Sequence, residues 1–348
     1  MAYRKSTKKN LKKPVGQSPY RGRKIYIDYD RQIEKLKLDG LEIQDEKRAK
    51  ERLKWEGYYN FAVGYNRLFK DEKRRYIKGT KFEHIEALYD FDRRIRDVVY
   101  EATQVVECNL KALVSDKFSR RYGVDERGYL TEQNFTNDPL EQGNVRWLLG
   151  TCKEVLKDGV KKTSGGYRDY IEHYANVYGH VPLWALIRAI SFGNTSRFLR
   201  FMKKEDKEEI AKEYSLKGKT LCNMTEILVN FRNIAAHGER VYSARLPSVR
   251  LTPSLSAVKK LSLPLNADGT QRFGKCDFLS FLICLKYLLS PAEYAYYHER
   301  VVKETERLAA VLPKFAMQRV YDETGLKGAW RKLDAIILDK HLDRYIEE

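Results

Sequence analysis

Helical periodicity runs through the chain from residue 28 onward and restricts the folds that it can adopt. Between Thr80 and Gly123, apolar residues recur at steps of three and four, the spacing that lines one face of an α-helix. They are Ile85, Leu88, Ile95, Val98, Val99, Ala102, Val106, Leu110 and Leu113. The alternation typical of strands appears only briefly, near residues 247–264, and no glycine-rich phosphate loop is present. The sequence therefore predicts an all-α fold and excludes a doubly wound nucleotide-binding fold.

Glycines and polar stretches divide this helical chain into three predicted regions. Residues 1–25 form a basic arm. Residues 26–80 form an N-terminal helical hairpin, whose two helices read "DRQIEKLKLDG" and "DEKRAKERLKWEGYYNFAVGY". Residues 81–348 form a larger all-α domain, in which the polar residues 124–144 are expected to make a surface loop and residues 245–275 an insertion of loops or a small hairpin.

Positive charge is concentrated in the basic arm. The formal net charge is +18, and residues 1–25 supply half of it because they hold nine basic side chains and no acidic one. These are Arg4, Lys5, Lys8, Lys9, Lys12, Lys13, Arg21, Arg23 and Lys24. Since it has few apolar residues with which to build a core, the arm is expected to stay flexible until it meets phosphates. Nucleic acid is therefore the first partner to consider, and a solubilising tail is the alternative.

The remaining composition argues against a metal site, a disulfide framework and a membrane span. The five cysteines are odd in number and widely spaced, which favours reduced thiols. No CxxC or HExxH pattern supplies metal ligands. The longest apolar run, residues 278–289, is too short to cross a bilayer and contains Lys286. Because the N-terminus also lacks an apolar signal segment, we expect a soluble intracellular protein.

One helical stretch, "FRNIAAHGER" at residues 231–240, carries an arginine, an asparagine and a histidine before a glycine. Asn233 and His237 are four residues apart and share a helix face, whereas Arg232 lies about 140° around the helix from His237, an angle that its long side chain can make up. Gly238 suits the position just past a helix end, so His237 is expected in the last turn. There the negative end of the helix dipole favours an imidazolium.

These residue types can cleave RNA without a metal or any other cofactor. Imidazole exchanges protons near neutral pH, so His237 can take the proton of a ribose 2′-hydroxyl or protonate the leaving 5′-oxygen. The guanidinium of Arg232 can neutralise the phosphorane, and Asn233 can hold the imidazole or a phosphate oxygen. The spacing alone is not diagnostic, because Arg168 and His173 repeat it without the asparagine and the glycine. A charged, solvated helix end is the alternative interpretation.

Together with other stretches of the chain, this motif resembles the Abi-like family of bacterial abortive-infection proteins, the AbiD and AbiF group, whose catalytic module belongs to the HEPN ribonuclease superfamily. The similarity covers most of residues 26–335 and includes "HYANVYGHVPLWALIRAISFG" and "FRNIAAHGERVY". The resemblance implies a HEPN-like helical bundle, and it assigns the ribonuclease motif to Arg232, Asn233 and His237. Where many members carry an asparagine after the motif, this sequence has Ser243.

The resemblance also implies partners and a setting. HEPN ribonucleases commonly pair two copies, so a homodimer with a composite active site is expected. Proteins of the AbiF kind resemble relatives of the RNA-targeting type VI CRISPR nucleases, and some are restrained by a structured noncoding RNA. The expected function is that of a cytoplasmic prokaryotic toxin, an endoribonuclease of phage defence that leaves 2′,3′-cyclic phosphate and 5′-hydroxyl ends.

Other residues are candidate contacts of the motif or of the RNA. Glu107 and Asn109 fall in a stretch that matches the family, and from a neighbouring helix Glu107 could orient His237 or Arg232; a packing or interface role is the alternative. The residues that follow the motif have a basic and aromatic character suited to phosphates and an unstacked base, although solvated loop positions would look the same. These residues are Arg240, Tyr242 and Arg245.

A second class of function fits the same features. In a noncatalytic RNA-binding or scaffold protein, the motif would grip phosphate without performing chemistry. This alternative accounts equally well for the net charge and the basic arm. It differs from the ribonuclease hypothesis in predicting that no RNA product forms under any condition.

Overall fold

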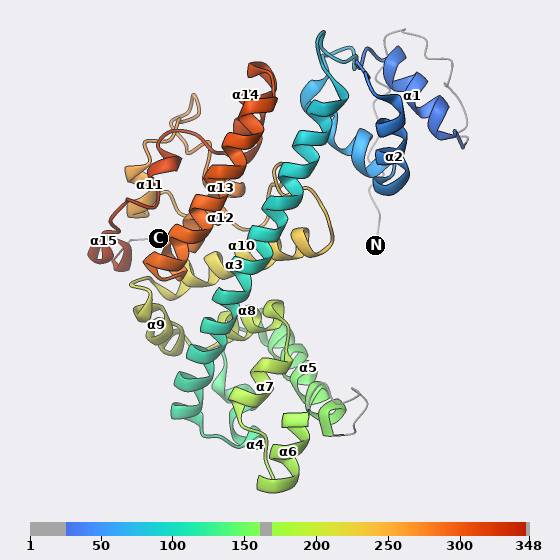
Figure 1. Cartoon of the computed structure of the whole chain (residues 1–348). Helices are drawn as coiled ribbons and strands as arrows, with labels where there is room; N and C mark the ends of the chain where they lie inside the picture. The colour runs from blue at the N-terminus through green and yellow to red at the C-terminus, as the bar shows by residue number, and fades with distance from the viewer. Residues whose placement is uncertain (1–25, 161–168, 346–348) are drawn as a thin grey trace, which may run out of the picture. The chain divides into compact units, whose positions relative to one another are not determined.

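The computed structural model describes residues 26–160 and 169–345. These residues form helices joined by turns, with isolated backbone bridges and no strand among them. The prediction of an all-α fold is therefore confirmed. The chain divides into two compact units, drawn in Figure 1: unit 1 comprises Met1–Gly64 and Lys70–Phe82, and unit 2 comprises Tyr65–Phe69 and Glu83–Glu348.

Unit 1 is built on a helical hairpin of α1 (Tyr29–Leu38) and α2 (Glu46–Glu56), which pack against each other. An aspartate precedes each helix and accepts a hydrogen bond from a backbone N–H of the first turn. Asp28 accepts from Arg31 and Asp45 from Arg48, both at 2.9 Å. The buried side chains of the two helices are Ile33, Leu36, Ala49 and Leu53.

The connection after α2 is more involved than a hairpin pattern predicts. The chain makes a π-helical turn, η1 (Tyr59–Val63), and then contributes five residues to unit 2, among them the 3-10 turn η2 (Arg67–Phe69). It returns to unit 1 at Lys70, and a parallel bridge between Glu42 and Lys81 closes that unit. Unit 1 is therefore a hairpin with a second, later segment laid beside it.

Unit 2 contains the longest helix, α3 (Phe82–Tyr122), and most of the remaining elements. After α3 these elements are α4 (Glu126–Tyr129), η3 (Glu132–Asn134), α5 (Gln142–Val160), α6 (Asp169–Tyr178), α7 (Leu183–Ala189), α8 (Phe192–Phe201), α9 (Lys204–Glu213), α10 (Gly218–Ala236), α11 (Ser256–Lys260), α12 (Phe278–Leu288), α13 (Pro291–Val311), α14 (Lys314–Thr324), η4 (Trp330–Lys332) and α15 (Lys340–Arg344).

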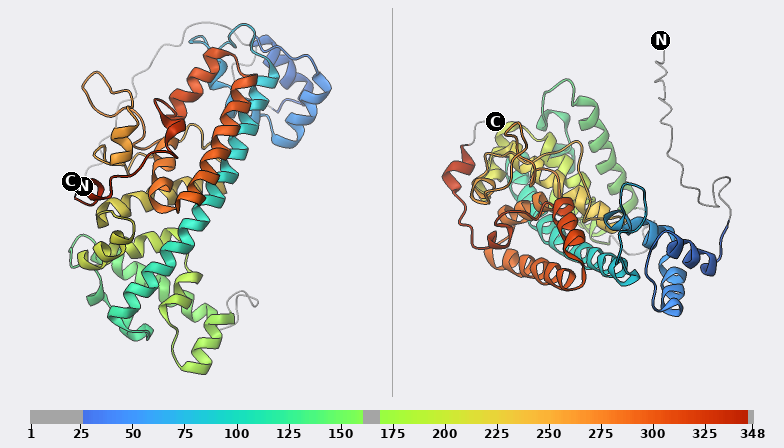
Figure 2. Two further views of the ribbon diagram at one scale, coloured as in Figure 1. Left: turned by 60° about the vertical axis from the view of Figure 1, so that its left-hand side comes forward. Right: turned by 90° about the horizontal axis from the view of Figure 1, so that it is seen from above.

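The apolar face predicted for α3 is the face that the helix buries. Eight of the nine predicted side chains are buried, and Leu113 is half-buried. The N-terminal half of α3 lies beside α13 (Figure 2), to which it is joined by the ion pairs Arg94–Glu304 and Arg300–Glu101. The long helix thus provides a backbone against which later segments of unit 2 are placed.

The centre of unit 2 is α10, which packs against α8, α9 and α12. Its Phe231 is fully buried, with its ring centroid 6.3 Å from that of Phe278 and 5.4 Å from that of Phe281. Burial of a side chain of this size stabilises the fold by about 1.5–3 kcal/mol. The helix that carries the candidate motif is therefore held by the core as far as Phe231.

The stretch 124–144 differs from its prediction as a surface loop. The hydroxyl of Tyr129 is buried and donates to the carbonyl of Val181 at 2.7 Å. Phe135 is also buried, with its ring centroid 5.5 Å from that of Phe118 and 5.1 Å from that of Phe198. Two aromatic anchors tie this polar stretch to the core, so the prediction is wrong at those positions. The 245–275 region contains the short α11 and an isolated antiparallel bridge between Leu265 and Gln271.

The membrane-span prediction can be examined only within the described residues, and the basic-arm prediction lies outside them. No helix in the described ranges 26–160 and 169–345 is both long and apolar enough to span a membrane. The nine cations of the basic arm lie outside the described residues, and so does Arg168.

Candidate active site

The motif lies at the C-terminal end of α10, where the helix leaves the core. The preceding positions Leu228 and Phe231 are fully buried. Arg232 is half-buried, whereas Asn233 and His237 are exposed. The structure therefore presents an imidazole to solvent at the end of a helix that is otherwise anchored in the interior.

The end of α10 is fixed by a left-handed glycine, as the sequence predicts. Gly238 has a φ of 68°. Glycine adopts this left-handed conformation at little steric cost because it has no side chain. Its backbone N–H donates to the Ala235 carbonyl at 3.1 Å, and the N–H of Glu239 donates to the Ile234 carbonyl at 2.9 Å. These two bonds are the pattern of a Schellman cap. His237, the last residue before the glycine, is thereby held in a defined backbone position.

The described residues show no hydrogen bond between the guanidinium of Arg232 and the imidazole of His237. Nη1 of Arg232 donates to Oδ1 of the neighbouring Asn233 at 3.1 Å. The imidazole of His237 has no hydrogen-bond partner among the residues that the structure describes. Arg232 and Asn233 thus form a hydrogen-bonded pair, and no hydrogen bond between described residues joins the His237 imidazole to that pair.

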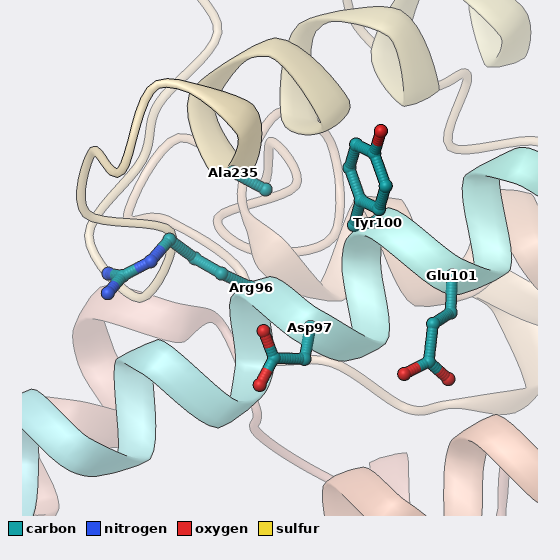
Figure 3. A pocket seen from close by; sticks show the side chains of 5 residues that line it. All are labelled: Arg96, Asp97, Tyr100, Glu101 and Ala235. Atoms are coloured by element: carbon teal, nitrogen blue, oxygen red, sulfur yellow. The ribbon is translucent and has the colours of Figure 1, made fainter.

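A shallow hollow opens beside the end of α10, next to the motif. It has a volume of about 240 Å³ and is lined by Arg96, Asp97, Tyr100, Glu101 and Ala235. Figure 3 shows that four of these residues come from α3 and that the ring of Tyr100 points toward α10. Ala235 is three residues after Arg232 and on the adjoining part of the helix surface. The motif therefore borders a hollow that contains both charges and an aromatic ring.

Arg96 is held at the edge of this hollow by a buried carboxylate. Its side chain is 12% exposed, and Nη1 donates to Oδ2 of Asp92 at 2.8 Å and to the Tyr65 hydroxyl at 3.1 Å. Tyr65 in turn donates to the same Asp92 oxygen at 2.7 Å. Bonds of a guanidinium to a carboxylate are among the stronger hydrogen bonds in proteins. The cation is therefore fixed in one orientation.

Asp92 also anchors the segment that follows the motif. The backbone N–H of Tyr242 donates to its other oxygen, Oδ1, at 2.7 Å. Burial raises the pKa of the Asp92 carboxyl, while the bonds from Tyr65, Arg96 and the backbone oppose that shift. One carboxylate thus joins α3, Tyr65 and the motif segment, although they are far apart in the chain.

Sequence reasoning missed Asp92, but a signal was present. It lies four residues after Leu88 and three before Ile95, which places a carboxylate on the buried face of the predicted helix. A buried carboxylate requires hydrogen-bond donors or a cation, because an unpaired buried charge is costly. A search for charged residues on apolar helix faces would have selected it.

The environment of Tyr242 corrects a prediction. The sequence predicts that this ring stacks on an unpaired base, but Tyr242 is 1% exposed and its ring centroid lies 5.7 Å from that of Tyr65. Burial raises its pKa to about 12. The ring is part of the core, so in this structure it cannot reach RNA.

Arg245 and Arg240 have different environments. Arg245 donates to three backbone carbonyls, those of Ala244, Asp322 (3.0 Å) and Glu323, and so caps the C-terminal end of α14. This structural use competes with its predicted contact to RNA. Arg240 is exposed, three residues after His237, and remains available as a candidate phosphate contact.

Glu107 does not contact the motif. Its carboxylate pairs with Lys111 one turn along α3 at 2.6 Å, and Lys111 also donates to the Ile190 carbonyl at 2.8 Å. The predicted contact with His237 or Arg232 is therefore not formed, and Glu107 instead pairs within its own helix. Asn109 is exposed on the same helix.

The competing histidine, His173, is exposed on α6. Its ring lies against those of Tyr174 and Tyr178, with centroids 5.8 and 6.0 Å away. Among the described residues, no cluster of three or more His, Cys, Asp or Glu side chains is arranged to hold a metal ion.

Comparison with known proteins identifies a family. The model of a family described as Abi-like protein matches residues 51–243, more than half of the chain. The matched region begins in α2, includes the whole of α3 and α10, and ends at Ser243, just after the motif. No curated protein and no solved structure matches the chain.

Proposed function

The chain belongs to the Abi-like protein family, whose function is of the abortive-infection type, and on that premise we propose that it is a metal-independent HEPN endoribonuclease. In this proposal Arg232, Asn233 and His237 form the catalytic motif. The enzyme acts as a toxin in phage defence and is bound and restrained by a structured noncoding RNA.

The observation that carries the proposal is the exposed His237 at the capped end of α10. A general acid or base must reach the substrate proton, and this imidazole is exposed and has no hydrogen-bond partner among the described residues. The core of unit 2 and the Schellman cap hold its backbone, so little ordering is needed when RNA binds. Arg232 and Arg240 are the cations closest to it in the chain.

The proposed chemistry is an intramolecular transesterification. One imidazole removes the proton of the ribose 2′-hydroxyl, the 2′-oxygen forms a bond to phosphorus, and the bond from phosphorus to the 5′-oxygen breaks. A second proton donor protonates the leaving oxygen. Arg232 neutralises the charge that develops on the phosphoryl oxygens. The products are a 2′,3′-cyclic phosphate and a 5′-hydroxyl.

This reaction requires a base and an acid, and the motif of one chain supplies one imidazole. Two copies of the motif, meeting across a two-fold axis, would supply both groups. No hydrogen bond between described residues joins Arg232 to His237 of the same chain, so a guanidinium from one copy could instead act beside the imidazole of the other. We therefore propose a homodimer with a composite active site.

A mixing experiment tests the composite site. Wild-type chains co-expressed with an excess of His237→Ala chains are expected to lose activity per wild-type chain, because most wild-type chains then sit in dimers with one imidazole. Dimers are isolated with two different affinity tags and assayed on a labelled RNA. Activity that simply follows the amount of wild-type chain would show that one motif suffices.

The basic arm is the proposed site of nonspecific attachment to RNA phosphates. Deletion of residues 1–25 is expected to flatten the dependence of log affinity on log salt, by about 0.9 for each duplex phosphate that the arm neutralises and about 0.7 for each single-strand phosphate. Binding measured over a series of salt concentrations gives both slopes. An unchanged slope in the truncated protein would remove the arm from the RNA-binding surface.

The noncatalytic alternative rests on the bond between Arg232 and Asn233. This pair could grip a phosphate while His237 takes no part in chemistry. In that case His237→Ala would bind RNA as the wild type does, and no product would form with either protein. RNA that copurifies with the wild-type chain can be sequenced and its ends mapped, which identifies the partner under both hypotheses.

A further inference from the structure

Unit 1 presents two large aromatic rings to solvent near the end of α2. Trp55 is 80% exposed and Tyr59 is 78% exposed. Single exposed aromatic residues are ordinary, but here two lie within five positions of the chain, Trp55 in the last turn of α2 and Tyr59 at the start of η1, and so much exposed apolar surface calls for a partner. We name these two side chains the α2 platform.

The backbone that carries the α2 platform is held by buried neighbours. Leu53, two residues before Trp55, is buried in the hairpin. The helix ends at Gly57, whose φ of 78° turns the chain into η1. Within η1, Phe61 is buried and its ring centroid lies 5.3 Å from that of Phe82. The rings are thus exposed without being on a loose segment, which lowers the cost of ordering them on binding.

Cations lie against aromatic rings at the α2 platform and beside it. Nζ of Lys54 lies 5.3 Å from the centre of the Trp55 ring. The neighbouring Tyr58 has Nζ of Lys35 5.7 Å from its ring centre. The sequence of α2, "EKRAKERLKWE", holds five basic and three acidic residues. Cations beside exposed π-faces favour a partner that is both anionic and aromatic.

We propose that Trp55 and Tyr59 stack on unpaired bases of a single-stranded RNA segment. Every nucleobase has a flat face, and the phosphates between bases complement Lys54, whose ammonium group lies against the Trp55 ring. The α2 platform rests on the proposed function and gives its RNA partner a binding surface.

Stacking on the α2 platform would favour single-stranded RNA over paired RNA. Bases in a duplex are stacked on each other and cannot offer a face to Trp55, whereas duplex phosphates still attract the cations. The noncoding RNA would therefore be bound through its loops or ends at this surface. Helical segments would contribute through charge alone.

The test compares leucine and phenylalanine substitutions at the two positions. All variants carry His237→Ala so that the RNA stays intact, and fluorescence anisotropy measures their affinity for a short labelled oligoadenylate and for an RNA duplex. Trp55→Leu and Tyr59→Leu keep apolar area but remove the π-face. Each is expected to weaken binding of the single strand about tenfold, and the pair about a hundredfold, with duplex binding unchanged.

Matched controls separate stacking from other effects. Trp55→Phe and Tyr59→Phe should keep most of the single-strand affinity because they retain a ring. Tyr345→Leu removes a ring that is 60% exposed outside unit 1 and should change nothing. Circular dichroism checks that each variant has the wild-type helix content.

Three results would overturn the α2 platform as an RNA surface. They are single-strand affinity unchanged in the double leucine variant, equal losses for single strand and duplex, and a change of oligomeric state, which would make the surface a contact with a second copy. The assay requires binding and no cleavage. If the ribonuclease proposal failed, RNA binding could still be measured in this assay. If the stacking proposal failed, the assignment of the catalytic motif would not be affected.

Discussion

Replacing His237 with alanine is expected to lower RNA cleavage by about 10²- to 10⁴-fold, the usual contribution of a general acid or base. The substitution removes the exposed imidazole of the motif while leaving the buried face of α10 unchanged. Growth arrest on expression should disappear with the cleavage. The measurement is the rate of cleavage of a labelled RNA by the purified variant, together with the growth of expressing cells.

The chain supplies a matched control for this prediction. His173 has the same spacing from an arginine and is also exposed, but it lies on α6 against Tyr174 and Tyr178. His173→Ala is expected to cleave RNA at the wild-type rate. Loss of cleavage in His173→Ala with full activity in His237→Ala would reverse the assignment of the motif.

Replacing Asp92 with alanine is expected to destabilise unit 2 by about 3–5 kcal/mol, the usual cost of removing one partner of a buried ion pair. Arg96 would be left without its carboxylate, and the Tyr65 hydroxyl and the Tyr242 backbone N–H without their acceptors. Since the last of these bonds fixes the segment after the motif, RNA cleavage should also fall. The urea midpoint of unfolding and the cleavage rate measure the two effects.

Asp97 provides the control for Asp92. It is also an aspartate of α3, five residues further along, but it is at the surface and has no hydrogen-bond or ion-pair partner among the described residues. Asp97→Ala is expected to change the free energy of unfolding by less than about 0.5 kcal/mol. Equal urea midpoints for Asp92→Ala and the wild type would show that the buried carboxylate does not hold the motif segment in place.

Local sequence signals predicted the helix and the helix end that carry the motif. The buried face of α10 follows from the spacing of Leu221, Met224, Leu228 and Phe231, and the stop follows from Gly238, because both depend on residues within a few turns of each other. The long α3 was predicted for the same reason. Its apolar periodicity extends over many helical turns, so a strand or a loop does not fit that segment.

The contacts of the side chains around the motif could not be predicted from local sequence signals. Tyr242 has the sequence context of an exposed aromatic residue in a basic loop, and its burial depends on Tyr65 and Asp92, which lie far back in the chain. Arg245 has the context of a phosphate contact, but it caps α14 through a carbonyl 77 residues later. Glu107 found its partner on its own helix. For Tyr242 and Arg245, contacts with residues distant in sequence determine the role of the side chain. For Glu107, an ion pair within its own helix replaces the predicted contact with the motif.

The chemistry of the RNA ends tests the central claim most directly. Purified wild-type protein is incubated with a labelled RNA in the presence of a metal chelator, and the termini of the products are mapped. The account predicts 2′,3′-cyclic phosphate and 5′-hydroxyl ends, formed by the wild type and absent with His237→Ala. Products with 5′-phosphate and 3′-hydroxyl ends, or the same cyclic ends from His237→Ala, would contradict it.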